Sequence, residues 1–239
     1  MTRLDWDDYA AALFDLDGVV TPTAEVHMRA WSQMFNDFLT ARGVAEPYTD
    51  EDYFAHVDGK PRYEGVAAFL ASRGIDLPQG DPSDNPDQDT VCGLGNRKND
   101  AFNEVLARDG VEAYPGSVRL LEALAERNLP MAIVSSSKNA PAVLEAAGVD
   151  HFFGFVMHGG VAAERGIAGK PAPDTFLAAA EELGVEPAQA VVLEDALSGV
   201  EAGAAGHFGL VIGVDRGAGE QALTGAGATL VVEDLGELL

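Results

Sequence analysis

The sequence is poor in cysteine, in lysine and in long apolar runs. Cys92 is the single cysteine among 239 residues, which excludes a disulfide within the chain and a metal site built from several cysteines. No apolar run approaches the roughly 20 residues that a helix needs to cross a bilayer. The first ten residues, MTRLDWDDYA, lack the basic and then apolar pattern of a secretion signal. We therefore expect a cytoplasmic protein with no membrane partner.

Positive charge is scarce as well. The chain has 39 Asp and Glu against 15 Lys and Arg, a formal net charge of −24 at pH 7. Such a surface repels nucleic acid, so we expect no nucleic-acid partner. Each lysine lies in a short segment rich in Gly, Pro, Ser or Asn, where a turn or a helix start can point it inward toward an anionic ligand. The four lysines are Lys60, Lys98, Lys138 and Lys170.

The second half of the chain alternates short apolar strands with helices. This alternation is typical of a parallel sheet covered on both faces, and it predicts an α/β fold with a Rossmann-like, doubly wound core. Ser117 is a candidate N-cap, and Gly148 and Gly184 are candidate helix ends. The predicted strands are 9–14, 130–134, 190–193 and 209–214, and the predicted helices are 117–127, 140–147, 174–183 and 196–205.

Between the first strand and this alternation, the pattern is helical. We predict helices over 23–42, 61–73 and 95–108, with a loop at 80–89 that contains two prolines. A long helical segment after the first strand of a parallel sheet indicates an insertion. We therefore predict a core domain of residues 1–21 and 109–239, and an inserted helical domain of residues 22–108.

Polar residues follow three of the predicted strands directly. The first strand runs into FDLDGVVT, the second into SSSKN and the third into LED. Because ligands of open parallel sheets bind beyond the carboxyl ends of the strands, these segments are expected to form one pocket. They would bring together four carboxylates, those of Asp15, Asp17, Glu194 and Asp195.

Four converging carboxylates need a cation, because their mutual repulsion otherwise raises their pKa values. A hard divalent ion such as Mg²⁺ suits oxygen ligands. Ser135 and the backbone N–H groups of the next helix can hold phosphate oxygens, and Lys170 adds a point charge. Acids, Mg²⁺ and anion donors together predict phosphoryl transfer.

The spacing of Asp15 and Asp17 allows the two carboxylates to have different roles in one reaction. In an extended segment, residues two apart point to the same side. One carboxylate can attack phosphorus and form an aspartyl-phosphate, while the other moves a proton to and from the departing oxygen. Gly18 lets the chain turn sharply after the pair.

Four motifs in this order resemble the haloacid dehalogenase superfamily, in its helical-cap subfamily and its β-phosphoglucomutase group: FDLDGVVTPTAEVH, IVSSSKN, GKPAPD and LEDALSGVEAG. The resemblance covers nearly the whole chain. It implies that Asp15 is the nucleophile and Asp17 the general acid and base, with Ser135 and Lys170 holding the transferring phosphoryl group. It also implies an Mg²⁺ site formed by Asp15, the backbone carbonyl of Asp17, Glu194 and Asp195.

The resemblance further implies substrate contacts. Ser137, Lys138 and Asn139 look like a second phosphate site, which a sugar bisphosphate needs. In the cap, His27 resembles a residue that couples closure to the general acid. Arg62 and Lys98 resemble residues that reach the distal phosphate and the sugar.

The sequence departs from the group's pattern at three positions. Pro22 stands where an acid is usual, Asp58 replaces a lysine of the cap loop with Lys60 two places further on, and Gly65 replaces a serine. These positions bear on which sugar is bound, and they leave the acid motifs intact.

The resemblance implies an Mg²⁺-dependent enzyme that interconverts β-glucose 1-phosphate and glucose 6-phosphate through glucose 1,6-bisphosphate, which would also act as an activator. The partner would be a small sugar phosphate, and the chain would be a monomer. An alternative is a sugar- or polyol-phosphate phosphatase with the same nucleophile. A third reading is a binding or regulatory protein without catalysis, and the intact acid pair argues against it.

Overall fold

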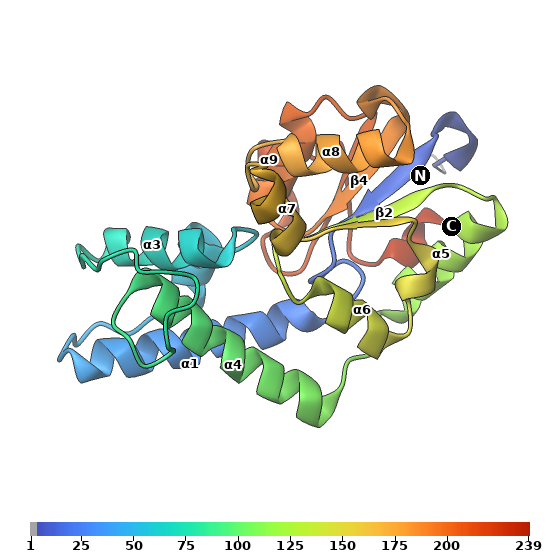
Figure 1. The fold of residues 1–239 in the computed structure, drawn as a ribbon. Coiled ribbons are helices and arrows are strands. Elements are labelled where there is room, and N and C mark those ends of the chain that lie inside the picture. Colours follow the sequence, from blue (N-terminus) through green and yellow to red (C-terminus); the bar gives the residue numbers. More distant parts are fainter. Residues whose placement is uncertain (1–3) are drawn as a thin grey trace. The chain divides into compact units, whose positions relative to one another are not determined.

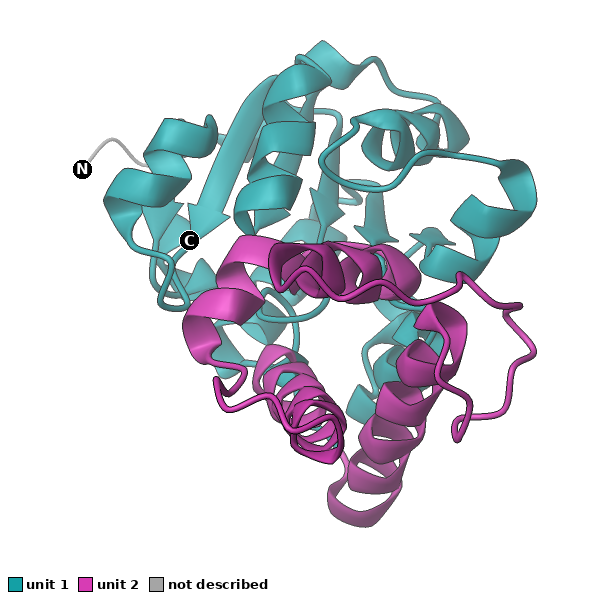
Figure 2. Cartoon of the chain, turned by 90° about the vertical axis from the view of Figure 1, so that its left-hand side faces the viewer, with its two compact units in different colours: residues 1–23, 111–239 teal, residues 24–110 magenta. Residues whose placement is uncertain are grey.

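The computed structural model describes residues 4–239, which form two compact units. Among the described residues, the sheet unit comprises residues 4–23 and 111–239, and the helical unit comprises residues 24–110 (Figure 2). The chain therefore leaves the sheet unit shortly after its first strand and returns to it at Val111. No helix within residues 4–239 has the length and apolar character to span a membrane.

The sheet unit is built on six strands that all run parallel, in the order β3-β2-β1-β4-β5-β6 (Figure 1). This order reverses direction between β1 and β4, the type of switch point beside which open sheets bind ligands. The predicted doubly wound α/β fold is confirmed. The strands are β1 (Ala11–Phe14), β2 (Met131–Val134), β3 (Phe155–Met157), β4 (Ala190–Glu194), β5 (Leu210–Val214) and β6 (Leu230–Val232).

Helices cover both faces of this sheet, α8 and α9 on one and α5 and α6 on the other (Figure 1). Alternate strand residues point to opposite faces, and Ala11, Leu13 and Val192 pack into the same apolar cluster as Phe176 of α8 and Val200 of α9. The helices are α5 (Pro115–Glu126), α6 (Ala140–Ala147), α7 (Gly159–Arg165), α8 (Asp174–Leu183), α9 (Leu197–Ala205) and α10 (Glu220–Ala226).

The sequence did not predict the two edge strands, β3 and β6, or the short helices α7 and α10. Each edge strand has only three residues, and each is partly exposed, whereas every residue of β1, β2 and β4 is buried. An edge strand is buried on fewer sides than a central one, so it needs no long apolar run. Such segments give a weak hydrophobic signal.

The start of α5 corrects one prediction. Ser117 was predicted as the N-cap, but the helix begins at Pro115 and Tyr114 is its N-cap residue. Proline suits the first position of a helix because its missing N–H has no partner there anyway. The hydroxyl of Ser117 instead donates to the backbone oxygen of Val19 at 2.7 Å, fully buried.

The helical unit packs around aromatic side chains, with Phe35 in contact with Tyr48 and Phe69. Its last helix starts four residues earlier than predicted, because Thr90 caps it by accepting from the N–H of Gly93. A side chain at Gly93 would meet the carbonyl of Gln88 at 2.3 Å, so this glycine permits close packing. The helices are α1 (Thr23–Ala41), α2 (Asp50–Asp52), a π-helical turn (Tyr53–Val57), α3 (Arg62–Ser72) and α4 (Val91–Asp109).

Candidate active site

The carboxyl ends of three adjacent strands, β2, β1 and β4, bring the predicted acids together. The register pairs Phe14 with Ile133 on one side and with Leu193 on the other. Asp15 and Glu194 therefore stand beside each other at the end of β1 and β4. The N–H of Asp15 continues the sheet by donating to Leu193 at 2.9 Å.

Lys170 is the centre of this group. Its Nζ donates to Asp15 Oδ1 at 2.5 Å, to Glu194 Oε1 at 2.6 Å and to the backbone oxygen of Val134 at 2.9 Å. The side chain is only 1% exposed, although lysine is rarely buried without paired charges. One buried ammonium thus joins the proposed nucleophile and a proposed metal ligand.

The site carries more negative than positive charge. Burial raises the pKa of Asp15 well above its ordinary value, and the neighbouring Glu194 and Asp17 add to this, while Lys170 opposes it. Burial alone would lower the pKa of Lys170, but Asp15 and Glu194 together hold it above its usual range. A protonated Lys170 among three carboxylates leaves an excess of negative charge.

Asp17 is held by hydroxyl groups. The Thr23 hydroxyl donates to Asp17 Oδ1, and the Ser135 hydroxyl lies 3.5 Å from Oδ2. The hydroxyls of Thr21 and Thr23 are 2.8 Å apart, and both threonines are buried. Thr23 stands in the same short segment as the acid pair, FDLDGVVTPT, but it was not predicted from the sequence as a site residue.

Two glycines leave room for the remaining carboxylates. Gly18 has a φ of +90°, and a side chain there would meet Asp195 Oδ2 at 1.9 Å. At Gly199 in α9, a Cβ would lie 1.7 Å from Glu194 Oε1. Glu194 is fully buried, and its second oxygen accepts from the N–H of Ala196 at 2.7 Å.

The predicted metal ligands can be compared with this geometry. Within residues 4–239, no group of three or more His, Cys, Asp or Glu side chains is arranged to hold a metal ion. The donors nevertheless fit Mg²⁺ in kind, because they are carboxylate oxygens in a buried group with excess negative charge. The metal site stays a prediction.

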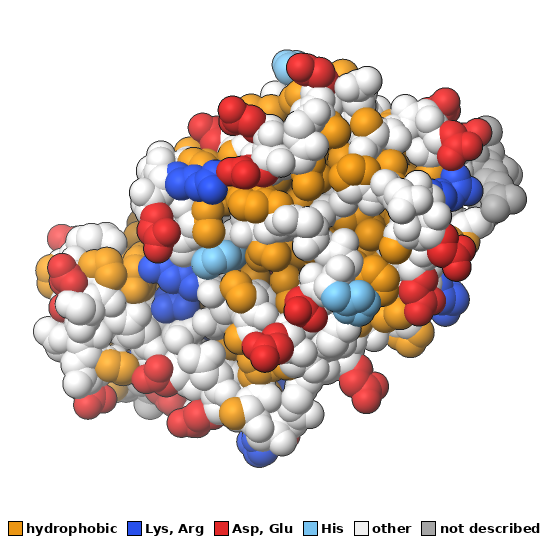
Figure 3. Space-filling view, turned by 45° about the vertical axis from the view of Figure 1, so that its right-hand side comes forward, with side chains coloured by type: hydrophobic (Ala, Val, Ile, Leu, Met, Phe, Trp, Pro, Cys, Tyr) orange, Lys and Arg blue, Asp and Glu red, His pale blue; other side chains and the backbone are white. Residues whose placement is uncertain are grey.

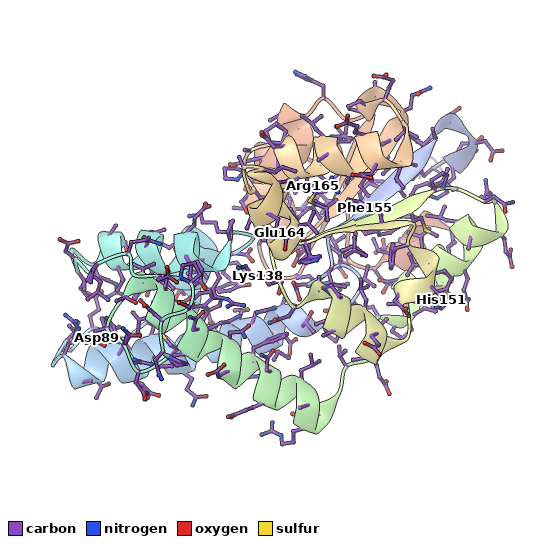
Figure 4. The ribbon with its side chains drawn as sticks, viewed as in Figure 1. Asp89, Lys138, His151, Phe155, Glu164 and Arg165 are labelled. Atoms are coloured by element: carbon purple, nitrogen blue, oxygen red, sulfur yellow. The ribbon has the colours of Figure 1, made fainter. Side chains whose placement is uncertain are left out.

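The predicted second phosphate site follows β2. Ser137 N–H donates to Ser135 Oγ, and Asn139 N–H donates to Ser137 Oγ, both at 3.1 Å. Ser137 also accepts through its backbone oxygen from Gly159 at 3.2 Å, and Lys138 lies in the same loop (Figure 4). Short side chains thus shape the loop that presents these three residues.

In the helical unit, His27 and Lys98 lie together. Lys98 is 4% exposed and donates to His27 Nδ1. Its Nζ lies 4.9 Å from the ring centre of Trp31 and 5.1 Å from that of Phe102, which itself stacks on His27. Aromatic faces attract an ammonium group, so the two rings stabilise the buried end of the Lys98 side chain.

The Arg62 side chain is held by hydrogen bonds to α4. It donates to Asn99 Oδ1 at 2.6 Å and to Asn96 Oδ1 at 3.5 Å, and burial lowers its pKa from the ordinary value. No pattern in the sequence marks either asparagine as part of the site. The third departure, Gly65, is buried against Val57, whose Cγ1 would lie 3.3 Å from an added Cβ, so the serine usual in the group would require Val57 to move.

Gly199→Ala should displace Glu194 and destabilise the protein. The new methyl group overlaps the carboxylate, and such overpacking costs about 1–3 kcal/mol. Urea unfolding would measure this loss. The matched control is Gly225→Ala in α10, where an added Cβ meets nothing within 4 Å and alanine favours the helix. Equal stability of the two variants would contradict the role of Gly199.

A family model for haloacid dehalogenase-like hydrolases matches residues 9–207. The chain belongs to this family. The predicted membership in the haloacid dehalogenase superfamily is thereby confirmed, and the matched range holds all the acids and lysines discussed above. On the face shown in Figure 3, the acidic side chains of this haloacid dehalogenase-like protein are scattered among apolar ones.

Named relatives of this haloacid dehalogenase-like protein confirm the predicted resemblance to the β-phosphoglucomutase group. It is 49% identical over 238 residues to a β-phosphoglucomutase of Mycobacterium bovis. The aligned region covers 96% of this chain and 91% of the relative. A fructose-1-phosphate phosphatase of Escherichia coli is 32% identical, covering 82% and 92%. A crystal structure of Clostridium difficile β-phosphoglucomutase, 26% identical, superimposes with a TM-score of 0.76 and covers 97% of this chain and 93% of that one.

Proposed function

We propose that this chain is an Mg²⁺-dependent β-phosphoglucomutase that works through a phosphoryl group on Asp15. The observation that carries the proposal is the buried Lys170, which joins Asp15 to Glu194 at 2.5 and 2.6 Å beside Asp17. The 49% identity to a mycobacterial β-phosphoglucomutase supports the same activity. The proposed substrate is a small sugar phosphate.

The residues of the sheet unit divide the reaction between them. A carboxylate oxygen of Asp15 attacks the phosphorus of a sugar bisphosphate, and the bond from phosphorus to the sugar oxygen breaks. Asp17 gives a proton to that departing oxygen and takes one back when the other sugar hydroxyl attacks the phosphoryl group. Thr23 and Ser135 orient the Asp17 carboxyl for both transfers.

Lys170 holds the nucleophile and neutralises charge during this transfer. Mg²⁺, held by Asp15, the backbone carbonyl of Asp17, Glu194 and Asp195, would supply the remaining positive charge for the phosphoryl oxygens. Burial raises the pKa of Asp15, and the neighbouring Glu194 and Asp17 raise it further, so a second cation beside Lys170 would favour the ionised nucleophile.

A mutase must bind two phosphate groups, so a second anion site is required. The proposed residues are Ser137, Lys138 and Asn139 after β2, whose loop is shaped by short hydrogen bonds. The helical unit would act as a cap, with His27, Arg62 and Lys98 contacting the sugar and the distal phosphate. We further propose glucose 1,6-bisphosphate as the activator, a monomeric chain and a cytoplasmic location.

The second candidate function is hydrolysis of a sugar phosphate. It is favoured by the 32% identity to a fructose-1-phosphate phosphatase, which covers 82% of this chain. Both reactions form the same intermediate on Asp15. They differ in what attacks it next, a sugar hydroxyl or water.

An assay with β-glucose 1-phosphate separates the two functions. We expect glucose 6-phosphate to form rapidly when a trace of glucose 1,6-bisphosphate and Mg²⁺ are added, with little free phosphate. Coupled detection of glucose 6-phosphate and direct detection of phosphate, run on the same samples, measure both products. Fast phosphate release without isomerisation would reject the mutase and support the phosphatase.

A further inference from the structure

Arg216 of the sheet unit contacts the backbone just after the acid pair. Its Nε donates to the carbonyl of Gly18 at 2.7 Å, and its Nη1 donates to the carbonyl of Glu233 at 2.8 Å. The guanidinium carbon also lies 4.0 Å from the ring centre of Tyr114. One planar side chain thus links three segments that are far apart in the sequence.

The backbone around Arg216 fixes where this side chain starts. Asp215 follows β5, and its N–H extends the sheet by donating to Val232 at 2.8 Å. The Asp215 carboxylate accepts from the N–H groups of Gly217 and Gly219 at 2.9 and 3.0 Å. Arg216 therefore projects from a closed turn that is anchored to two strands.

The turn that Arg216 contacts, residues 16–21, contains Asp17 and packs against Asp195. The N–H of Gly18 donates to the backbone oxygen of Thr21 at 2.7 Å. The N–H groups of residues 20 and 21 each donate to the backbone oxygen of Leu16 at 3.0 Å. Gly18 also packs so closely on Asp195 that a Cβ would lie 1.9 Å from its carboxylate. The Gly18 carbonyl belongs to the peptide between Gly18 and Val19, and a rotation of this peptide would shift Gly18 against Asp195 and, through the chain, the Asp17 residue that precedes it.

The segment that returns to the sheet unit is tied to the same turn. Tyr114 N–H donates to Val20 at 2.9 Å, and the Ser117 hydroxyl donates to Val19 at 2.7 Å. Arg216 lies against the ring of Tyr114 while bonding Gly18, so it contacts both segments at the point where they meet.

We propose that Arg216 is a positioning residue for the acid pair, which sets the orientation of the Gly18 peptide and so the places of Asp17 and Asp195. This inference rests on the proposed function of the acid pair. Only a guanidinium can serve both carbonyls from one plane while it covers an aromatic ring. A lysine could reach one carbonyl at most.

Hydrogen exchange tests the holding of the turn without any substrate. In Arg216→Met, we expect the amides of residues 16–21 to exchange about tenfold faster, because the turn opens locally. Arg216→Lys should be intermediate, and the amides of β4 should be unchanged. The matched control is Arg127→Met, which removes an exposed ion pair with Asp7. Unchanged exchange at residues 16–21 in Arg216→Met would overturn the proposal.

Kinetics test whether this holding matters for the reaction. We expect Arg216→Met to lower kcat by about 10–100-fold, the scale of a small misplacement of catalytic groups, with less than about threefold change in KM. Arg216→Lys should recover part of kcat, and Arg127→Met should match the wild type. Faster exchange together with an unchanged kcat would reject the positioning role. A wild type without mutase activity would reject the proposed function, while the exchange result would still decide whether Arg216 holds the turn.

Discussion

Asp15→Asn is expected to abolish turnover and, at the same time, to stabilise the metal-free protein at neutral pH. The amide cannot attack phosphorus, so activity should fall by at least about 10⁴-fold, the scale seen when a member of a catalytic unit is removed. Quenched mass spectrometry should find the phosphoryl adduct on the wild type and none on the variant.

The gain in stability follows from the direction of the pKa shift. The pKa of Asp15 is raised in the folded protein, so its contribution to stability is present in acid and is lost as pH rises toward the folded value. Between the ordinary pKa of the unfolded chain and the folded value, the wild type loses about 1.4 kcal/mol of stability for each pH unit, and asparagine avoids this loss. A chain of this size should melt roughly 2–4 °C higher for each kcal/mol gained.

Thermal unfolding in a chelating buffer, from pH 5 to 8, measures this effect. The two proteins should converge as pH falls, and Mg²⁺ should reduce the advantage of the variant by stabilising the wild type. Asp76→Asn, at an exposed position, is the control for the loss of one negative charge. An Asp15→Asn protein that is less stable than the wild type at pH 7 would show that the lost ion pair with Lys170 outweighs the cost of burying the Asp15 charge beside Glu194 and Asp17.

The acids could be predicted from the sequence because strand ends are visible in it. Asp15 and Glu194 each follow or end a short apolar run, and a parallel sheet places the carboxyl ends of its strands along one edge. Lys170 is different. It comes from no strand end, and its place beside Asp15 was implied by the resemblance, not by any periodicity.

The supporting residues could not be predicted, because their roles depend on contacts made only in the folded chain. Thr23 is the first residue of α1, where a threonine is ordinarily read as a helix start, and its bond to Asp17 depends on how the turn closes. Arg216 contacts Gly18 across 198 positions of sequence. No local pattern carries such a pairing.

The role of two glycines likewise could not be predicted in full from the sequence. The sequence indicated that Gly18 permits a turn, but its packing against Asp195 is visible only in three dimensions. Gly199 lies inside α9, where a glycine usually weakens a helix. A glycine is needed at this position because the buried Glu194 carboxylate leaves no space for a methyl group.

Lys170→Met is expected to lose activity and to be strongly destabilised at neutral pH. Methionine keeps the length of the side chain but removes the charge that balances Asp15 and Glu194. Removing one partner of a buried ion pair costs about 3–5 kcal/mol, because the remaining charges stay desolvated. Urea unfolding should show a midpoint well below that of the wild type.

The pH dependence of this loss distinguishes unpaired charge from simple packing. Without Lys170, the pKa of Asp15 should rise further, and a raised pKa adds stability in acid that disappears as pH increases. The deficit of Lys170→Met should therefore be largest near pH 8 and smaller near pH 5.

The double variant Asp15→Asn/Lys170→Met should recover part of the stability, because one of the two unpaired carboxylates is gone. Lys60→Met, which removes a lysine whose ammonium donates to the backbone carbonyl of His56, controls for the substitution itself. A deficit that is equal at both pH values and unchanged in the double variant would mean that Lys170 acts by filling space, and the charge balance proposed for the site would be wrong.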